Sequence, residues 1–229
     1  MLEREEIPLN RIDIFVANRE ELRAYREVLG SGYNLIVGVP GIHRQREFIH
    51  NYYPEGARLL CIDDDVRRIR TLYPGVPLDI LVERMFELAA EAGCRLFGIY
   101  PNDSGLNLRD RAVIGHTFII GCFFGMVNVR GIQYPHPTTE DWFRTLTYSL
   151  LDGKVMRFEG LGPTTSYCKE PGGLQTYRTA ERQEIEMRHL AGRWPRLLRL
   201  RHKSGRFVDV QMRRARNVVV EDPFDTRCE

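Results

Sequence analysis

The chain has 229 residues, of which 43% are hydrophobic and 28% are charged. This composition is typical of a soluble globular protein and excludes collagen-like, disulfide-stapled and disordered chains. A chain of this length can bury roughly 70% of its unfolded surface in one core or in two small ones.

Basic residues are concentrated near the C-terminus. Lys and Arg total 33 against 31 Asp and Glu, yet residues 188–217 hold ten basic residues and one acid. This asymmetry predicts a polyanionic partner. We expect a catalytic body over residues 1–186 and a basic segment over 187–229 that packs on it or extends it. A solvated amphipathic helix and strand would explain the basic segment equally well.

The cysteines and the termini indicate the compartment. The five cysteines are scattered and have no CxxC spacing, which argues against a disulfide framework and a zinc site and favours a reducing cytoplasm. The charged N-terminus has no secretory signal. Residues 112–129 carry no charge and reach the lower length limit of a membrane span. Their glycines and β-branched residues instead predict two buried strands, broken near Gly121 and Gly125, and no membrane contact.

Strands and helices are predicted to alternate along the chain. Asn18 and Glu21 form a capping-box pattern at the start of a helix that ends at Gly30. Alternation of this kind predicts an α/β fold, a mostly parallel sheet flanked by helices. The expected elements are strand 12–17, helix 18–30, strand 34–39, helix 42–53, strand 58–62, helix 78–92, strand 96–100, helix 139–151, strand 154–158, loop 160–179 and helix 180–190.

Asp63, Asp64 and Asp65 directly follow a predicted buried strand. Open α/β sheets bind ligands beyond this end of their strands, and neighbouring carboxylates repel one another unless a positive group lies among them. A hard divalent cation, Mg²⁺ or Mn²⁺, would meet that need with carboxylate, water and phosphate oxygens. The alternative is a solvated turn whose acids pair with Arg67 and Arg68.

Three further patterns suggest ligand contacts. Gly41 precedes a helix start that carries Arg44 and Arg46, an arrangement that can hold a diphosphate or be an exposed basic turn. Glu140 and Asp141 can supply a general base or merely complement a helix dipole. The loop residues Gly172, Gly173 and Gln175 permit close approach to an acceptor, or form a simple tight turn.

The order of these patterns resembles GT-A-type glycosyltransferases. More narrowly, it is similar to the DNA glycosyltransferases associated with the TET/JBP hydroxylases, a group that includes the base J glucosyltransferase and bacteriophage members. Four stretches carry this resemblance, and it spans about residues 12–175. They are Gly41 to Arg46, Asp63 to Asp65, Thr139 to Asp141 followed by Leu151 to Lys154, and Pro171 to Gln175.

The resemblance implies transfer of a sugar from a nucleotide donor, such as a UDP-sugar, to the hydroxymethyl group of a 5-hydroxymethylpyrimidine in DNA. It implies that Asp65 holds the metal, that Asp63 contacts the donor ribose and the metal, and that Asp141 or Glu140 faces the acceptor. The implied donor-pocket residues are Asn18, Arg19, Gly41, Arg46, Asp63 and Asp64. Many GT-A enzymes add a C-terminal histidine to the metal, but neither His189 nor His202 lies in a motif that marks it.

Three other functions remain open from the sequence. A metal-dependent nucleotidyltransferase also needs carboxylates near a strand end and a phosphate-binding turn. A non-catalytic nucleic-acid-binding module would use the basic segment and not the aspartates. A glycosyltransferase acting on a protein or small molecule would not need the basic segment.

Overall fold

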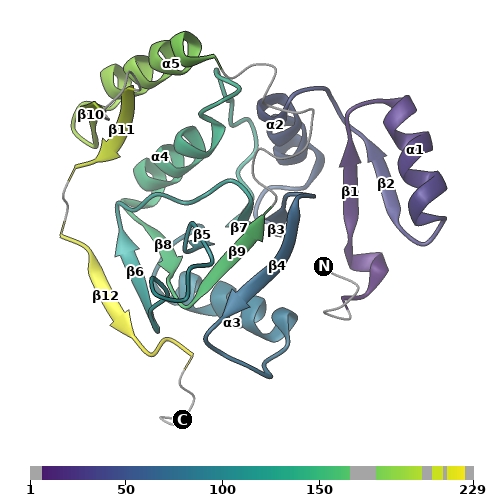
Figure 1. Ribbon diagram of the computed structural model, residues 1–229, viewed down its shortest axis with the longest axis horizontal. Coiled ribbons are helices and arrows are strands. Elements are labelled where there is room, and N and C mark those ends of the chain that lie inside the picture. Colours follow the sequence, from purple (N-terminus) through teal and green to yellow (C-terminus); the bar gives the residue numbers. More distant parts are fainter. Residues whose placement is uncertain (1–6, 166–178, 203–207, 214–215, 225–229) are drawn as a thin grey trace.

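The computed structural model describes residues 7–165, 179–202, 208–213 and 216–224. In this part of the chain, strands and helices form an α/β structure with a mixed sheet between helical layers (Figure 1). The strands are β1 (Asp13–Val16), β2 (Asn34–Val37), β3 (Arg58–Ile62), β4 (Val66–Thr71), β5 (Leu96–Ile99), β6 (Arg111–Gly115), β7 (Phe123–Val127), β8 (Val155–Phe158), β9 (Leu161–Thr165), β10 (Leu198–His202), β11 (Val208–Met212) and β12 (Val218–Glu221). The helices are α1 (Arg19–Leu29), α2 (Ile42–Tyr52), α3 (Leu78–Glu91), α4 (Glu140–Asp152) and α5 (Ala180–Arg193), with a short 3₁₀ helix at Leu9–Arg11.

The central sheet of the described chain has six strands in the order β12-β6-β8-β5-β7-β3. Only β5 and β8 pair in parallel; the other neighbouring pairs are antiparallel. The prediction of a mostly parallel sheet is therefore wrong for this sheet. The physical reason is that β6 and β7 follow connections without a helix, and only a crossover connection, usually helical, brings the next strand back in the same direction.

Three strands of the central sheet nevertheless run in the same direction and end at a common edge. Since β3 and β5 are each antiparallel to β7, they run the same way, and β8 is parallel to β5. The carboxyl ends of β3, β5 and β8 therefore lie at one edge of the sheet, together with the amino ends of β6 and β7. The aspartate triplet, after β3, and the loop before β7 lie at this edge.

The two faces of the sheet bury different helices. On β5, Phe97 and Ile99 pack with α3, whereas Leu96 packs with α4 and α5. On β7, Phe123 likewise faces α3 and Phe124 the opposite side. This alternation follows from the two-residue period of a strand and explains why both strands are apolar throughout.

The uncharged stretch 112–129 contributes to the sheet as two buried strands, β6 and β7, as predicted. They are separated by residues 116–122, so the break near Gly121 is confirmed. The break near Gly125 is wrong, because Gly125 lies inside β7, where the ring of Phe97 occupies the space that a side chain would fill. None of the helices in the described ranges is long and apolar enough to cross a membrane.

The first part of the chain forms a parallel β1–β2 pair joined by α1, as its strand-helix-strand pattern predicts. Asn18 caps α1 through its side-chain oxygen, which accepts from the backbone N–H groups of Glu20 and Glu21, and Glu21 accepts from Ala17. The predicted cap at Asn18 is confirmed, with Glu21 bonding to the N–H of Ala17 in place of that of Asn18. The hydroxyl of Tyr53, at the end of α2, donates to Asp13 on β1 and ties this unit to the rest.

The C-terminal part packs against the body. Met187 and Leu190 of α5, together with the β10–β11 hairpin, join the same core as α4. The hairpin turns Leu198 and Val210 inward, while Arg199 and Arg201 are exposed. β12 then pairs with β6 and forms the outer strand of the central sheet. The region predicted as a loop over 160–179 begins with β9, which pairs with β4.

Candidate active site at the carboxyl edge of the sheet

The aspartate triplet forms a turn immediately after β3. The backbone N–H of Val66 donates to the carbonyl of Asp63 at 3.2 Å, and Asp63 N–H donates to the carbonyl of Cys122 at 3.0 Å. Asp is a favoured first residue of such turns. The triplet thus lies beyond the strand end, as predicted, and its backbone is bonded there to Cys122, the residue before β7.

Asp63 forms a salt bridge with Arg46 of α2. The Arg46 side chain is only 8% exposed and also donates to the carbonyl of Gly121 at 3.2 Å. Burial raises the pKa of Asp63 above its ordinary value, and the Arg46 charge opposes that rise. Arg46, predicted to line the donor pocket, therefore holds the Asp63 carboxylate directly.

A second buried ion pair lies beside the first. Arg144 on α4 is fully buried, bonds Glu140 at 2.8 Å and stacks over the ring of Phe124, with its guanidinium carbon 3.6 Å from the ring centre. Arg46 lies over the same ring at 5.2 Å. The two arginines and two acids form a compact charged layer in which each charge has a partner, which a low-dielectric site requires.

Gly121 makes this close packing possible. A Cβ at Gly121 would lie 2.8 Å from Glu140 Oε1 and 3.5 Å from Asp141 Cβ. The loop before β7 therefore lies directly against the first turn of α4, and a side chain at position 121 would displace the acids. The glycine that the sequence marked only as a strand break has a packing role here.

The Cys122 thiol lies among the residues predicted to bind metal and to act as base. Its pKa is raised to about 12 by burial and by the negative charges of Asp63, Asp65 and Asp141. The Asp63 N–H bond to the Cys122 carbonyl and the close approach of Gly121 to Glu140 and Asp141 bring the end of β3 and the start of α4 to the same loop, although they are separated by more than seventy residues in sequence. Neither segment alone could have predicted this proximity.

Glu140 and Asp141 occupy different environments. Glu140 is buried and bound to Arg144, whereas Asp141 is partly exposed and accepts from the backbone N–H of Trp142 at 2.8 Å. Of the two acids, Asp141 is the one whose carboxylate is accessible to a substrate. Glu140 instead fixes Arg144 beneath the site.

The remaining predicted donor residues lie within the triplet, at the start of α1 and at the start of α2. Asp64 is exposed and accepts the Tyr25 hydroxyl of α1 at 3.1 Å. Asn18 is engaged in its helix cap, and Arg19 is exposed in the first turn of α1. Gly41 is the N-cap of α2 with φ of 88°, a left-handed conformation that favours glycine.

Several contributors were not predicted. Arg144 could have been found from its i,i+4 spacing to Glu140. Glu159, directly after β8, is buried between Arg157 and Arg111. Burial alone would raise the pKa of Glu159, but hydrogen bonds from these arginines lower it below its ordinary value. No sequence signal linked Arg111 to Glu159, because the two come together only through the pairing of β6 with β8.

The predicted acceptor residues Gly172, Gly173 and Gln175 lie outside the described residues. Within the described ranges, no three His, Cys, Asp or Glu side chains are grouped as metal ligands. His189 forms a 2.6 Å contact with His136, and Glu186 nearby accepts from Thr138. One or two carboxylates with water and phosphate suffice for Mg²⁺, so a site at Asp63 and Asp65 would not need a third protein ligand.

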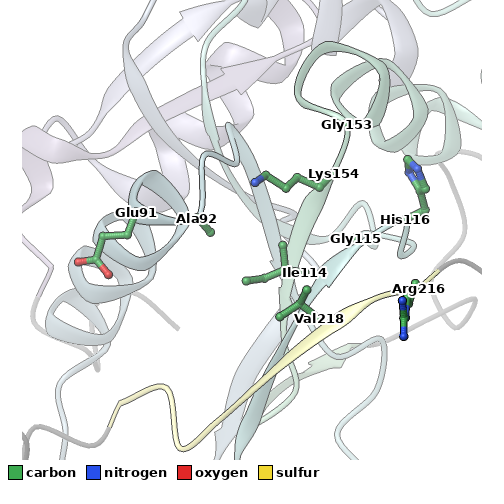
Figure 2. Close-up of a pocket in the computed structure, with 9 residues that line it drawn as sticks. All are labelled: Glu91, Ala92, Ile114, Gly115, His116, Gly153, Lys154, Arg216 and Val218. Atoms are coloured by element: carbon green, nitrogen blue, oxygen red, sulfur yellow. The ribbon is translucent and has the colours of Figure 1, made fainter.

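A pocket of about 570 Å³ lies at the other end of the strands (Figure 2). It is lined by the apolar side chains of Ile114 and Val218 and by the basic groups of His116, Lys154 and Arg216. Lys154 precedes β8, whereas the triplet follows β3, which runs the same way. The pocket is therefore separate from the candidate active site. Lys154 also lies beside Gly93 at the end of α3, where a positive charge complements the helix dipole.

Comparison with known proteins adds no relative. No protein-family model, curated protein or solved structure matches the chain. Function must therefore be argued from the site itself.

Proposed function

We propose that the protein is a metal-dependent glycosyltransferase of GT-A type that moves a sugar from a nucleotide-sugar, such as a UDP-sugar, to the hydroxymethyl group of a 5-hydroxymethylpyrimidine in DNA. The observation that carries the proposal is that the triplet and Asp141 both adjoin the loop before β7: Asp63 N–H donates to the Cys122 carbonyl at 3.0 Å, and a Cβ on Gly121 would lie 3.5 Å from Asp141 Cβ. The shared direction of β3, β5 and β8 supports the GT-A assignment, since such folds bind donors at this edge.

The donor diphosphate would lie at the triplet. Asp65, with Asp63, would hold Mg²⁺ or Mn²⁺, which supplies positive charge against the negative charge that develops on the leaving diphosphate. Asp63 is already fixed by Arg46, so its free oxygen is held in one orientation. Fixing the carboxylates in advance lowers the reorganisation needed in the transition state.

Asp141 would act on the acceptor. It accepts the proton of the hydroxymethyl group as the oxygen forms a bond to the anomeric carbon, and the bond from that carbon to the diphosphate oxygen breaks with its electron pair on the diphosphate. Glu140 does not take this role, because its carboxylate is committed to Arg144. Its part is to position α4 and so Asp141.

Exposed arginines support a DNA acceptor. Arg68 and Arg70 follow the triplet on β4, and Arg199 and Arg201 project from the β10–β11 hairpin. Arginines of this kind contact phosphates without regard to sequence. Both groups therefore provide cationic surface for a polyanion.

One assay tests reaction, donor and acceptor together. The protein is incubated with hydroxymethylated or unmodified DNA, a panel of UDP-sugars and Mn²⁺, and the nucleosides are analysed by mass spectrometry. The proposal predicts a hexose or pentose mass added only to hydroxymethylated DNA. Transfer of a nucleotide in place of a sugar, or binding of DNA without any product, would overturn it in favour of a nucleotidyltransferase or a binding module.

A further inference from the structure

An aromatic pair lies next to the acids of the candidate site. The rings of Phe118 and Trp142 are 4.4 Å apart between centroids, with an interplanar angle of 33°. Phe118 comes from the segment between β6 and β7, and Trp142 from the first turn of α4. Both side chains are partly buried and partly accessible.

This aromatic pair adjoins Asp141 on one side and a cluster next to the triplet on the other. Trp142 is adjacent in sequence to Asp141, to whose carboxylate its backbone N–H donates. Phe118 packs on the cluster formed by Val66, Ile120 and Cys122, of which Val66 immediately follows the triplet. A flat apolar surface is thus placed within the same neighbourhood as the proposed metal ligands and the proposed base.

Neighbouring residues also hold the backbone of Phe118 and the side chain of Trp142 in place. Arg157 donates to the carbonyl of Phe118 at 3.4 Å, and its guanidinium is bound by the buried carboxylate of Glu159. Trp142 additionally packs on the core formed by α4 and α5. A stacking surface for a ligand needs this kind of support, because a mobile ring loses conformational entropy on binding.

We propose that Trp142, supported by Phe118, stacks on the pyrimidine ring of the acceptor nucleotide after that base has left the DNA helix. This inference rests on the proposed function and deepens it. Enzymes that modify a base inside a duplex extrude it and bind it between aromatic or apolar side chains, since the reacting atom is otherwise inaccessible. Asp141, one residue away, would then meet the hydroxymethyl group attached to the stacked ring.

Intrinsic fluorescence gives a direct test, because the chain has two tryptophans, Trp142 and Trp194. Trp194 lies at the end of α5 and contacts Phe143 in an edge-to-face arrangement. Trp194→Phe leaves Trp142 as the sole indole, and Trp142→Phe leaves Trp194. Each is titrated with a fluorescein-labelled hydroxymethylated oligonucleotide, whose binding is followed by anisotropy, and with an unlabelled one, which reports tryptophan quenching.

The proposal predicts quenching that saturates with DNA binding in Trp194→Phe and no quenching in Trp142→Phe. Equal quenching in both variants, or DNA binding without quenching of Trp142, would overturn it. If the wild type neither binds nor modifies hydroxymethylated DNA, the proposed function fails, and this inference fails with it. A wild type that modifies DNA with unquenched Trp142 removes only the stacking role.

Kinetics separate stacking from core packing. Trp142→Leu should raise the KM for DNA roughly tenfold, the size expected for loss of one base–aromatic stack, and leave the KM for the donor unchanged. Trp194→Leu is the matched control, because it also removes a packed indole, but one that lies at the end of α5 and packs in the core formed by α4 and α5; it should lower Tm without changing either KM. A Trp142→Leu variant that lowers Tm and leaves the KM for DNA unchanged would show that Trp142 is only a core residue.

Discussion

Arg46 and Asp63 form a salt bridge that joins α2 to the end of β3, with the Arg46 side chain 8% exposed and that of Asp63 32% exposed. The pair fixes the first residue of the aspartate triplet before any ligand arrives. The position of the Asp63 carboxylate therefore depends on α2, a helix from an earlier segment of the chain.

Replacing Arg46 by Met should destabilise the protein by about 2 kcal/mol, less than the 3–5 kcal/mol typical of a fully buried pair, because solvent reaches part of Asp63. The Asp63 carboxylate would be left charged in a low-dielectric environment. Urea unfolding of the single variant and of Arg46→Met/Asp63→Asn measures the loss. The double variant should recover part of it; a double variant no more stable than the single would contradict the assignment.

The destabilisation in Arg46→Met should depend on pH. Arg46 opposes the rise in the pKa of Asp63 that burial causes, so removing Arg46 raises that pKa further. A protonated Asp63 needs no partner. The stability difference between wild type and variant should therefore be full above the raised pKa and should fade as the pH falls below the wild-type pKa, as urea unfolding from about pH 8 to about pH 4 would show.

Asp65→Asn should lower metal-dependent sugar transfer by at least about 100-fold and leave the fold unchanged. The carboxylate lies beyond the strand, so its loss removes a metal ligand without opening a cavity. Transfer rates across a Mn²⁺ titration at saturating donor provide the measurement. Glu87→Gln on α3, which removes a surface acid on the far face of the sheet, should retain the wild-type rate. Wild-type turnover in Asp65→Asn would exclude Asp65 as a ligand.

Asp141→Asn should mainly lower activity, whereas Glu140→Gln should mainly lower stability. Asp141→Asn should lower kcat by about 10²–10⁴, the range for loss of a general base, with little change in Tm. Glu140→Gln should destabilise the protein by about 3–5 kcal/mol, because it leaves the fully buried Arg144 without its counterion. Calorimetry and transfer assays on both variants test the division of roles. A stable, inactive Glu140→Gln would reverse it.

His50 should make the protein sensitive to acid. It is buried between Asn128 and Tyr134, with contacts of 2.8 and 2.7 Å, and burial lowers its pKa from 6.5 to about 4. The unfolded chain therefore binds a proton at a pH where the folded chain does not. Stability should be full above pH 6.5 and fall by about 3 kcal/mol as the pH drops towards 4.

Unfolding free energies measured across this pH range test the role of His50. His50→Gln cannot titrate, so its stability should lack this component of the acid loss, even if the substitution lowers stability at every pH. An identical slope in His50→Gln and wild type would assign the acid sensitivity to other groups.

Local patterns in the sequence predicted much of the fold. The capping box at Asn18 and the strand before Asp63 depend on a few neighbouring residues, so their signals lie within one segment. These patterns did not predict the strand directions in the central sheet. The segments before β6 and β7 contain no helix that would bring the next strand back in the same direction. For the site, the triplet and Asp141 were recognisable, whereas the layer of Arg46 and Arg144 over Phe124 depends on three segments that meet only after folding.

The pairing of β12 with β6 has a consequence for biosynthesis. The strand that completes the outer side of the central sheet is synthesised more than 100 residues after β6, the strand with which it pairs. Until then β6 presents open backbone donors and acceptors, which are prone to pair with other nascent chains. Premature termination just upstream of residue 218 should therefore yield aggregates rather than a shortened native protein.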